Sequence, residues 1–354
     1  MTKRLLIVNS GGDCPGMNAV IRAIVKRAHQ ENNWEVIGSI NGFDGILSEP
    51  LDIEILTDKR VSGIHFLGGT ILQTNNKRNP FSYPVLQKNG KTENQDLSDK
   101  LILNLKILGV TSIIHIGGNE SHKISFELQK KGIDIVGIPK TINNDLSITD
   151  YAFGFQTAAQ IATYAVDKLV TTASSHNRVI IMEVMGRDAG WIALHAAIAG
   201  GADVCLIPEI PFSIEKVIRK LRSRYKNEKG FANIVVAEGA CPIGENCSVL
   251  EGTLALKISK ELKRHGLEAD IRETILGHLQ RGGVPIAFDR IIATELGVHA
   301  FELVLENKFG VMVAHQQQRV IPVPFVEVID KYHDVDLNGN LVKTARGVGI
   351  SFGD

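Results

Sequence analysis

The chain of 354 residues lacks the features that would place it in several large classes of protein. Its 39 Lys and Arg residues balance 39 Asp and Glu residues, so it has no basic excess of the kind that nucleic-acid-binding domains carry. No run reaches the roughly 18 apolar residues of a membrane-spanning helix. The N-terminal apolar run, Leu5 to Val8, is too short for a signal peptide. We therefore expect a cytoplasmic protein that binds neither nucleic acid nor a membrane.

Cysteine is scarce and has no metal-ligand spacing. The four cysteines are Cys14, Cys205, Cys241 and Cys247. The last two lie six residues apart in a polar loop, and this spacing could be taken for a disulfide pair. We expect four free thiols instead, as in a protein of the reducing cytosol.

The composition is that of a large globular enzyme. Hydrophobic residues make up 44% of the chain and charged residues 22%, which is ample for a substantial core. A chain of this length exceeds the usual size of a single core, so two domains are expected. Short apolar runs alternate with helical patterns along the chain, which indicates an α/β fold.

Two glycine-rich turns each follow a short apolar run and precede a helical pattern. The first, residues 10–16, follows a strand over 4–8 and precedes a helix from residue 17 to 28. The second, residues 117–121, follows a strand over 112–116 and precedes a helix from residue 122. In this layout backbone N–H groups and a helix N-terminus bind an anion. Glycines that serve only the geometry of a tight turn would give the same pattern.

Residues 137–145, Gly-Ile-Pro-Lys-Thr-Ile-Asn-Asn-Asp, form the segment richest in candidate chemistry. A buried strand over 133–138 is expected to stop at Pro139, which cannot continue a sheet ladder. A cation, a hydroxyl, two amides and one carboxylate, that of Asp145, follow within six residues. Ligands bind at the carboxyl ends of strands in open α/β sheets. The segment is therefore equipped for phosphate chemistry, although it offers one carboxylate where two are usual.

Three segments are notable for their charged or polar composition. Residues 88–99 are charged and read as an exposed loop. A helix over 156–169 is expected to give way to a polar segment over 171–178. The tail from Tyr332 is rich in glycine and aspartate, and we expect it to pack loosely.

Cationic residues recur at strand ends and in glycine-rich segments. They are Arg178, Arg187, Arg272, His278 and Arg281. Each one alone is more often part of an ion pair or a structural contact than a ligand group. Together they suit a sugar phosphate, whose hydroxyl groups Glu238 and Asp145 would bind. Lys77 and Arg78 could likewise cap a phosphate, or belong to a solvated surface turn.

Seven ordered motifs resemble those of the phosphofructokinase family and cover essentially the whole chain. They are residues 10–18, 137–145, 154–158, 174–178, 183–187, 199–203 and 276–283. The resemblance implies two Rossmann-like three-layer α/β/α domains with the active-site cleft between them. It implies a phosphate-donor domain formed by residues 1–154 with 280–330. The fructose 6-phosphate domain would comprise residues 155–279 with 331–354.

The fructose 6-phosphate site that the resemblance implies is intact. Contacts to the sugar ring and its hydroxyl groups are expected from Thr141, Asp145, Met185, Gly186, Arg187 and Glu238. Contacts to the 6-phosphate are expected from His278 and Arg281 and, from a neighbouring subunit, Arg178 and Arg272. Asp145 and Arg187 are also assigned to catalysis. The resemblance thus implies a homo-dimer or homo-tetramer, or a hetero-oligomer with an active paralogue.

The phosphoryl-transfer half departs from the family pattern at two catalytic positions. Its implied residues are Gly12, Asn76, Lys77, Gly118, Asn119, Glu120, Ser121 and Lys140. The family's Asp that takes the proton from the sugar 1-hydroxyl is Asn143 here, and its Asp that helps to hold Mg²⁺ is Asn119. An amide has no usable basicity at neutral pH, so catalysis is expected to be weakened at Asn143. An amide also lacks the charge of a carboxylate, so Mg²⁺ binding is expected to be weakened at Asn119.

The identity of the phosphoryl donor stays open between ATP and pyrophosphate. Glu120 occupies a position where a glycine suits ATP and an aspartate suits pyrophosphate, and its carboxylate would repel a polyphosphate unless a cation intervened. Lys140 is typical of pyrophosphate-using members and of some unusual ATP-using members, including a bacterial and cyanobacterial-like subgroup.

Three functions are consistent with this pattern. The preferred interpretation is a weakly active or inactive homologue that binds fructose 6-phosphate as a sensor or regulatory subunit. The alternative is a functional 6-phosphofructokinase of glycolysis, which transfers phosphate from ATP or pyrophosphate to fructose 6-phosphate and gives fructose 1,6-bisphosphate. The third is a structural paralogue that binds nothing, and the intact set of sugar residues argues against it.

Overall fold

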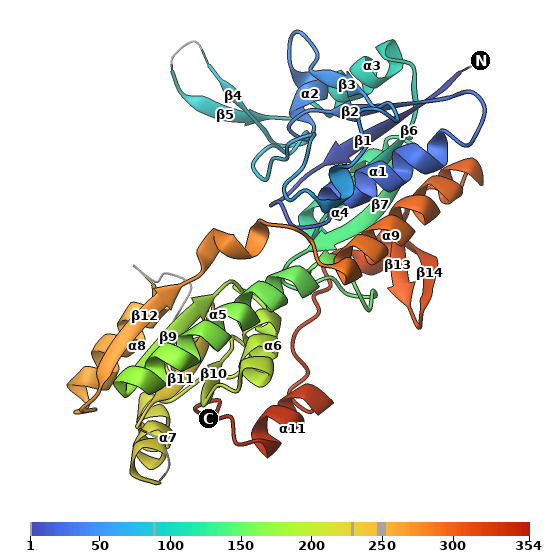
Figure 1. Cartoon of the computed structure of the whole chain (residues 1–354). Coiled ribbons are helices and arrows are strands. Elements are labelled where there is room, and N and C mark those ends of the chain that lie inside the picture. The colour runs from blue at the N-terminus through green and yellow to red at the C-terminus, as the bar shows by residue number, and fades with distance from the viewer. Residues whose placement is uncertain (1, 88–89, 228–229, 246–252) are drawn as a thin grey trace. The chain divides into compact units, whose positions relative to one another are not determined.

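The computed structural model describes residues 2–87, 90–227, 230–245 and 253–354, which form two compact units (Figure 1). Unit 1 consists of Met1–Ile142, Leu146–Gly154 and Arg281–Tyr332. Unit 2 consists of Asn143–Asp145, Phe155–Gln280 and His333–Asp354. Each unit contains its own largely parallel sheet with helices on both faces, so the expected α/β fold class is confirmed.

Unit 1 is built on an eight-stranded sheet in the order β14-β13-β7-β6-β1-β2-β3, with β8 paired to β7. Its strands are β1 (Lys3–Asn9), β2 (Trp34–Ser39), β3 (Ile53–Ile55), β6 (Val110–Gly117), β7 (Ile135–Thr141), β8 (Phe153–Gly154), β13 (Val311–Gln316) and β14 (Arg319–Pro324). Its helices are α1 (Met17–Ala28), α2 (Asp44–Leu47), η1 (Ile64–Phe66), α3 (Ser98–Ile107), α4 (Asn119–Lys130), α9 (Ala287–Leu305) and α10 (Phe325–Val328). Strands β1, β2, β6 and β7 are mutually parallel, so their carboxyl ends meet at one edge.

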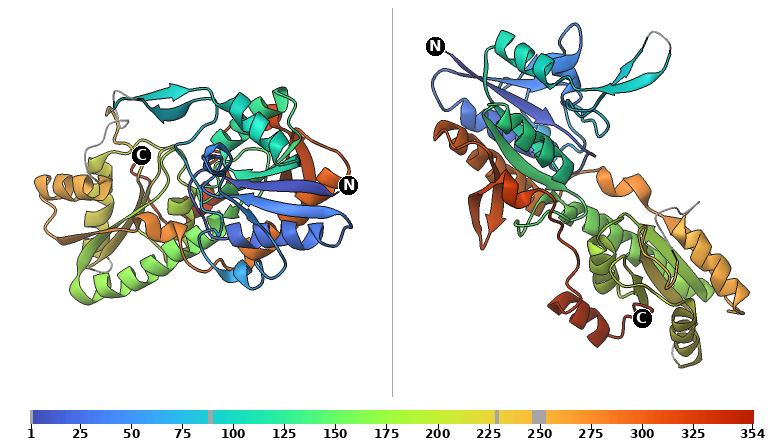
Figure 2. Two further views of the ribbon diagram at one scale, coloured as in Figure 1. Left: turned by 90° about the horizontal axis from the view of Figure 1, so that it is seen from above. Right: turned by 180° about the vertical axis from the view of Figure 1, so that it is seen from behind.

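Helices cover both faces of this sheet. Helices α1 and α9 pack side by side against one face, as Figures 1 and 2 show. Helices α2, α3 and α4 enclose a second apolar layer, to which β1 contributes Leu6 and Val8. Side chains alternate across a strand, so the intervening residues of β1 point to the α1 side. The buried sheet therefore supplies a rigid base for the turns at its carboxyl edge.

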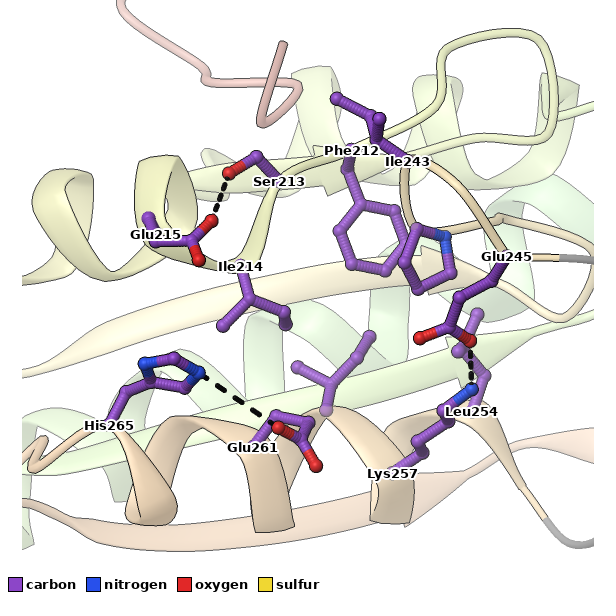
Figure 3. Close-up of a pocket in the computed structure, with 12 residues that line it drawn as sticks. Phe212, Ser213, Ile214, Glu215, Ile243, Glu245, Leu254, Lys257, Glu261 and His265 are labelled. Carbon is purple, nitrogen blue, oxygen red and sulfur yellow. Dashed lines mark hydrogen bonds and ion pairs between the residues drawn. The ribbon is translucent and has the colours of Figure 1, made fainter.

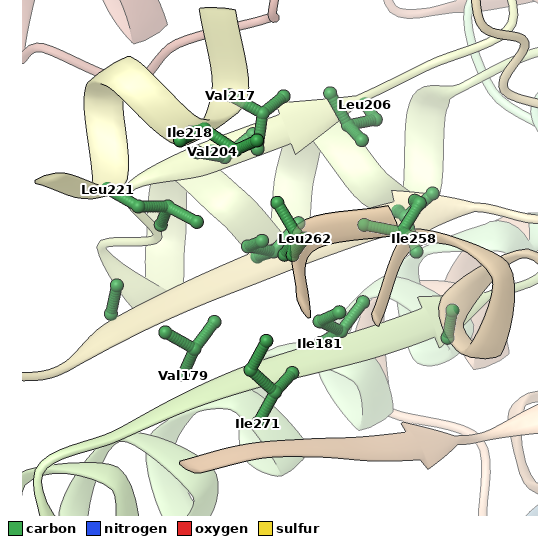
Figure 4. Close-up of a cluster of buried hydrophobic side chains, with 14 of the residues drawn as sticks. Val179, Ile181, Val204, Leu206, Val217, Ile218, Leu221, Ile258, Leu262 and Ile271 are labelled. Atoms are coloured by element: carbon green, nitrogen blue, oxygen red, sulfur yellow. The ribbon is translucent and has the colours of Figure 1, made fainter. Parts of the chain in front are cut away.

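Unit 2 contains a parallel four-stranded sheet in the order β10-β11-β9-β12. Its elements are α5 (Phe155–His176), β9 (Arg178–Val184), α6 (Trp191–Gly200), β10 (Val204–Leu206), α7 (Ile214–Asn227), β11 (Ala232–Ala237), α8 (Leu254–Arg264), β12 (Asp270–Ile275), η3 (Gly277–Arg281) and α11 (Asn340–Gly347). Helices α7 and α8 close one apolar layer, in which Val179 and Ile181 meet Leu221 and Leu262 (Figure 4). Ile180 points to the opposite face, against α5.

The strand before residues 141–145, the predicted catalytic loop, continues through its proline, contrary to expectation. Strand β7 runs to Thr141 and includes Pro139. Its pairing with β13 covers only Val136 and Gly137, and β8 pairs with β7 from Lys140 onward. Pro139 therefore lies beyond the part of β7 that pairs with β13. Its lack of an N–H group costs no hydrogen bond to β13.

Three expectations of irregular structure were wrong. In the charged segment 88–99, residues 88 and 89 lie outside the described residues and residues 90–96 are exposed as expected, but they include β5 (Thr92–Gln95), which pairs with β4 (Tyr83–Leu86). Helix α5 extends through the polar segment to His176. The tail forms α11 and buries Phe352 completely.

The cysteines also differ from expectation. Cys14 and Cys205 are free and buried, and burial raises the pKa of the Cys14 thiol to about 12. Cys241 is disulfide-bonded, so the prediction of a free thiol is wrong there. Cys247 lies outside the described residues. Among the helices that the structure describes, none is long and apolar enough to cross a membrane.

Candidate functional site

The first glycine turn follows β1 and is held by the segment that precedes Asn76. Gly11 adopts a φ of +83°, a left-handed conformation that favours glycine. Its N–H donates to the Asn75 carbonyl at 3.0 Å, and its carbonyl accepts from the Thr74 hydroxyl at 2.7 Å. Asn76 and Lys77, both predicted donor contacts, are exposed immediately after these anchors. The structure thus brings residues 74–77 to the first turn.

Lys140 and Arg281 reach the same turn from distant parts of unit 1. The buried Lys140 ammonium donates to the Gly12 carbonyl. A Cβ atom at Gly12 would come within 2.6 Å of an Arg281 nitrogen, so a side chain there would displace the guanidinium. Arg281 also donates to the Asp13 carbonyl at 3.1 Å. Two cations, one predicted for the donor and one for the sugar phosphate, therefore lie against one backbone turn.

The second glycine turn connects β6 to the N-terminus of α4. A Cβ atom at Gly117 would come within 2.2 Å of the Ser121 Cβ, so no side chain fits there. The first backbone N–H groups of a helix have no partner within the helix and bind anions. The buried Ser121 hydroxyl accepts a hydrogen bond of 2.8 Å from the Ser10 hydroxyl. This bond joins the two predicted phosphate turns.

Arg78 fits the surface alternative rather than a phosphate contact. It donates to the Pro84 carbonyl at 3.3 Å, lies 3.6 Å from the Asp44 carboxylate and packs over the Tyr83 ring. The guanidinium of Arg78 is therefore engaged by neighbouring residues of unit 1.

Glu120 is paired with a cation that the sequence pattern did not reveal. Its carboxylate, on a side chain 76% exposed, lies 2.7 Å from the Lys123 ammonium. Lys123 also contacts Asp330 at 2.8 Å, and these two carboxylates raise its pKa. The spacing of three residues on a helix was the available signal, since side chains at this spacing are neighbours. Lys123 thus offsets the charge that would repel a polyphosphate.

The described residues do not form a magnesium site of their own. Asn119 is half-buried, and its amide nitrogen donates to the Lys331 carbonyl at 3.1 Å. Its side-chain oxygen is a neutral ligand, whereas Mg²⁺ usually takes one or two carboxylates. Within residues 2–87, 90–227, 230–245 and 253–354, no three His, Cys, Asp or Glu side chains cluster as metal ligands would. We therefore derive no step through a metal held by the protein.

The predicted catalytic loop is held by a histidine of the tail. The backbone N–H of His333 donates to the Asp145 carbonyl at 3.1 Å, and its Nδ1 lies 3.1 Å from the Asn144 carbonyl. A carbonyl can only accept, so this nitrogen carries the proton. Trp191 donates to the His333 carbonyl at 2.8 Å. Sequence reasoning missed His333, because a lone histidine in a polar tail gives no signal.

Within that loop, Asn143 and Asp145 lie together. The Asn143 amide donates to an Asp145 carboxylate oxygen over 3.4 Å. Asn144 between them has a φ of +56°, which turns the backbone sharply. Thr141 lies before the loop, at the end of β7 and opposite Gly154.

Several predicted sugar contacts gather at the carboxyl edge of the unit 2 sheet. The N–H of Gly186 approaches the Glu238 carboxylate at 3.5 Å, and the N–H of Met185 donates to the buried Gln280 side chain at 3.2 Å. Gln280 also donates to the Gly277 carbonyl at 3.0 Å, which ties η3 to the strand end. The sequence analysis did not select Gln280. The remaining contacts, Arg187 and His278, are exposed.

Arg178 and Arg272 lie apart from that edge. Arg178 is the first residue of the seven-residue strand β9, whereas Met185 follows its last residue. At ~3.3 Å per residue, roughly 20 Å of strand separates them. Asp270 pairs with Arg178 at 2.6 Å and with Arg272 at 2.9 Å, and the Arg178 contact is the main cause that lowers the pKa of this carboxyl group. The structure therefore joins these arginines to each other and not to Met185 of the same chain.

Unit 2 also has a separate pocket of about 390 Å³ (Figure 3). Apolar side chains such as Phe212 meet two ion pairs there, Glu245 with Lys257 and Glu261 with His265. None of the predicted site residues is among the twelve described residues that line it.

Comparisons with known proteins agree on one family. The sequence pattern of the family described as Phosphofructokinase matches residues 4–304. The chain is 45% identical to ATP-dependent 6-phosphofructokinase 2 of Clostridium perfringens, with 99% of each chain covered. It is 43% identical to ATP-dependent 6-phosphofructokinase 1 of Synechocystis, again with 99% of each chain covered.

Solved structures with this fold include two of different size. A pyrophosphate-dependent phosphofructokinase from Nitrosospira multiformis has a TM-score of 0.82 at 21% identity, with 99% of this chain and 93% of that chain covered. A Pichia pastoris phosphofructokinase in the T-state has a TM-score of 0.78 at 28% identity, with 98% of this chain covered. The present chain spans only 36% of the Pichia chain.

Proposed function

Because the chain belongs to the phosphofructokinase family, we propose that it transfers the terminal phosphoryl group of ATP to fructose 6-phosphate, giving fructose 1,6-bisphosphate. The observation that carries this proposal is the junction of the two glycine turns with Lys140 in unit 1. Ser10 bonds to Ser121 at 2.8 Å across the turns, and Lys140 donates to Gly12. Phosphoryl transfer depends mainly on positioning and charge stabilisation, which such a junction supplies.

In the proposed donor site, backbone groups bind the polyphosphate. The N–H groups of the first glycine turn and of the α4 N-terminus provide hydrogen bonds, and Lys140 provides charge. Lys123, which lies 2.7 Å from Glu120 and 2.8 Å from Asp330, reduces the negative charge that a polyphosphate would meet there. ATP is the proposed donor because the relatives that align along the full length of this chain carry ATP in their names.

In the proposed acceptor site, the carboxyl edge of the unit 2 sheet binds the sugar. Glu238 accepts from sugar hydroxyl groups, and Arg187 and His278 are exposed to bind anionic groups. Arg178 cannot reach this edge within its own chain, because β9 separates the two ends. We therefore assign Arg178 and Arg272 to the site of a second copy, in a homo-oligomer.

The proton of the reacting hydroxyl requires a base. Asn143 cannot serve, since an amide has no usable basicity at neutral pH. Asp145 lies 3.4 Å from the Asn143 amide and provides a carboxylate in the same loop. We assign Asp145 this role, and expect slower turnover than an aspartate at position 143 would give.

A second function is favoured by the two substitutions themselves. General base catalysis is typically worth ~10²–10⁴-fold in rate, and loss of a metal carboxylate removes a further contribution. A chain with Asn119 and Asn143 would then bind fructose 6-phosphate and act as a sensor or regulatory subunit with little turnover.

One assay separates the two functions. Fructose 1,6-bisphosphate is measured directly with micromolar protein, Mg²⁺ and fructose 6-phosphate, with ATP and pyrophosphate supplied in separate reactions. The Asn119→Asp/Asn143→Asp variant is measured alongside. Turnover of the natural protein with ATP at a rate near that of the variant supports the kinase. Turnover only in the variant supports the sensor, and product from pyrophosphate alone contradicts ATP as the donor.

A further inference from the structure

A buried histidine lies directly beneath the proposed donor site. His115 belongs to β6, and its side chain is fully buried. Its Nε2 lies 2.5 Å from the Ser10 hydroxyl, and its Nδ1 lies 2.7 Å from the Ser125 hydroxyl. The imidazole therefore connects the end of β1 to helix α4 through two side-chain contacts.

The neutral form of this ring determines the direction of the hydrogen bond in each contact. Burial is the main cause that lowers the pKa of His115 well below its ordinary value, and the Lys140 charge acts in the same direction, so the ring is neutral. A neutral imidazole has one N–H group and one acceptor nitrogen. One of the two serines therefore accepts a hydrogen bond from the ring, and the other donates to it. An apolar side chain in this position would leave two buried hydroxyl groups without these partners, which is unfavourable.

The network continues to the second glycine turn. The Ser10 hydroxyl donates to Ser121 at 2.8 Å, so Ser10 accepts from the ring and the single Ser125 proton is donated to the other ring nitrogen. Ser10 directly precedes Gly11 of the first turn, and Ser121 lies in the first turn of α4. Both phosphate turns are thus fixed to the same buried ring.

We propose that His115 is a positioning residue for the phosphoryl donor, because its contacts with Ser10 and Ser125 fix the spacing of the two glycine turns. The inference rests on the proposed function and deepens it. A phosphate bound by both turns would require their N–H groups to be held at a fixed separation, and displacement of either turn weakens binding. The contacts of Thr74 and Asn75 with Gly11 also support the first turn, so we expect partial loss of donor affinity when His115 is altered.

A pair of amide substitutions separates the two contacts. The side chain of His115→Gln reaches toward the Nε2 position and retains a partner for Ser10. The side chain of His115→Asn ends near the Nδ1 position and retains a partner for Ser125 alone. We expect His115→Asn to raise the Kd for MgATP about tenfold, the equivalent of one or two hydrogen bonds, and His115→Gln to raise it less. The Kd for fructose 6-phosphate should stay within about twofold of the natural value, since only the donor turns are displaced.

The experiment is titration calorimetry of the full chain with MgATP alone and with fructose 6-phosphate alone. Thermal unfolding of each variant is recorded alongside. Ser10→Ala removes the same contact together with the bond between Ser10 and Ser121, so it tests the whole network around His115 if the histidine variants do not fold. Ser125→Ala removes the other contact of the ring, and we expect it to weaken MgATP binding less than Ser10→Ala does, because it leaves the contact between His115 and Ser10 in place.

The outcomes are distinct. Weaker MgATP binding by His115→Asn and by Ser10→Ala, with fructose 6-phosphate binding retained, supports the inference. Lower thermal stability without a change in MgATP affinity would show that the ring has only a structural role and overturns it. A natural protein that binds fructose 6-phosphate but no nucleotide would overturn the proposed donor site and this inference with it.

Discussion

The side-chain amide of Asn143 lies 3.4 Å from a carboxylate oxygen of Asp145. This places a carboxylate beside the position at which the family resemblance predicts a base. Asp145→Asn is therefore expected to reduce turnover by about 10²–10⁴-fold, the usual contribution of a general base. The measurement is the rate of fructose 1,6-bisphosphate formation at saturating substrates.

Asp150→Asn is the control for this change. Asp150 accepts a hydrogen bond from the backbone N–H of Gln317 and lies outside the proposed chemistry. Asp145→Asn protein that turns over as fast as the natural protein would place the proton acceptor elsewhere.

Lys123 pairs with Glu120 at the N-terminus of α4, beside the proposed donor turns. Lys123→Ala leaves the Glu120 carboxylate uncompensated at the N-terminus of α4, where it competes with a polyphosphate. We expect the KM for MgATP to rise roughly threefold to tenfold at low ionic strength, because an exposed charge contributes only modestly. The effect should shrink as salt screens the charge, which a series of KM measurements in rising NaCl would follow.

A matched control exists in the same helix. Lys130 pairs with Glu127 at 2.7 Å and the same spacing, but in the last turn of α4. Equal effects of Lys123→Ala and Lys130→Ala would contradict a specific role for Lys123.

The assignment of Arg178 to a second copy can be tested by mixing two inactive proteins. Arg178→Ala damages the proposed site of the neighbouring subunit, and Arg187→Ala damages the chain's own site. Random exchange into dimers should restore about a quarter of the natural activity, because half of the dimers are mixed and each of these has one intact site. Activity is measured after denaturation and joint refolding.

Each variant refolded alone provides the baseline. If Arg178 acts within its own chain, no mixture contains an intact site and the activity stays at that baseline. Size-exclusion chromatography of the mixture establishes that oligomers have formed.

Local sequence patterns predicted the elements that frame the site. Helix α1 begins and ends at the expected residues, Met17 and Ala28, because its apolar spacing and the preceding glycines are short-range signals. The tail gave no such signal. Its burial depends on contacts made far away in the sequence, such as the pairing of Ser351 with Val204.

In the candidate site, too, features that depend on neighbouring residues could be predicted, whereas contacts between distant residues could not. The two glycine turns are recognisable from residues next to each other in the sequence. The contact of His115 with Ser10 joins residues 105 positions apart, and the contact of Asn119 with Lys331 spans 212 positions. No local pattern predicts such pairs. The roles of Asn119 and Asn143 stay predictions, since they concern chemistry with ligands.

We expect His122 to lower the stability of unit 1 as the pH falls. Its side chain is fully buried and stacks on Phe325, and burial is the main cause that lowers its pKa to about 3. In the unfolded chain the same group titrates near its ordinary pKa of 6.5. Below pH 6.5 the unfolded chain therefore takes up a proton that the folded chain does not, and the free energy of unfolding falls as the pH falls toward 3. Between pH 6.5 and 5 this one group should remove about 2 kcal/mol, at ~1.36 kcal/mol per pH unit.

Replacement of His122 by leucine should remove this slope. The measurement is denaturant unfolding of the natural protein and of His122→Leu at several values between pH 7 and pH 5. We expect the stability difference between the two proteins to shift by about 2 kcal/mol in favour of His122→Leu across that range. His299→Gln is the control, because His299 is exposed on α9 beside Glu302 and lies outside the core. A stability difference that stays constant with pH would show that His122 is protonated to the same extent in both states, and that burial does not exclude its charge.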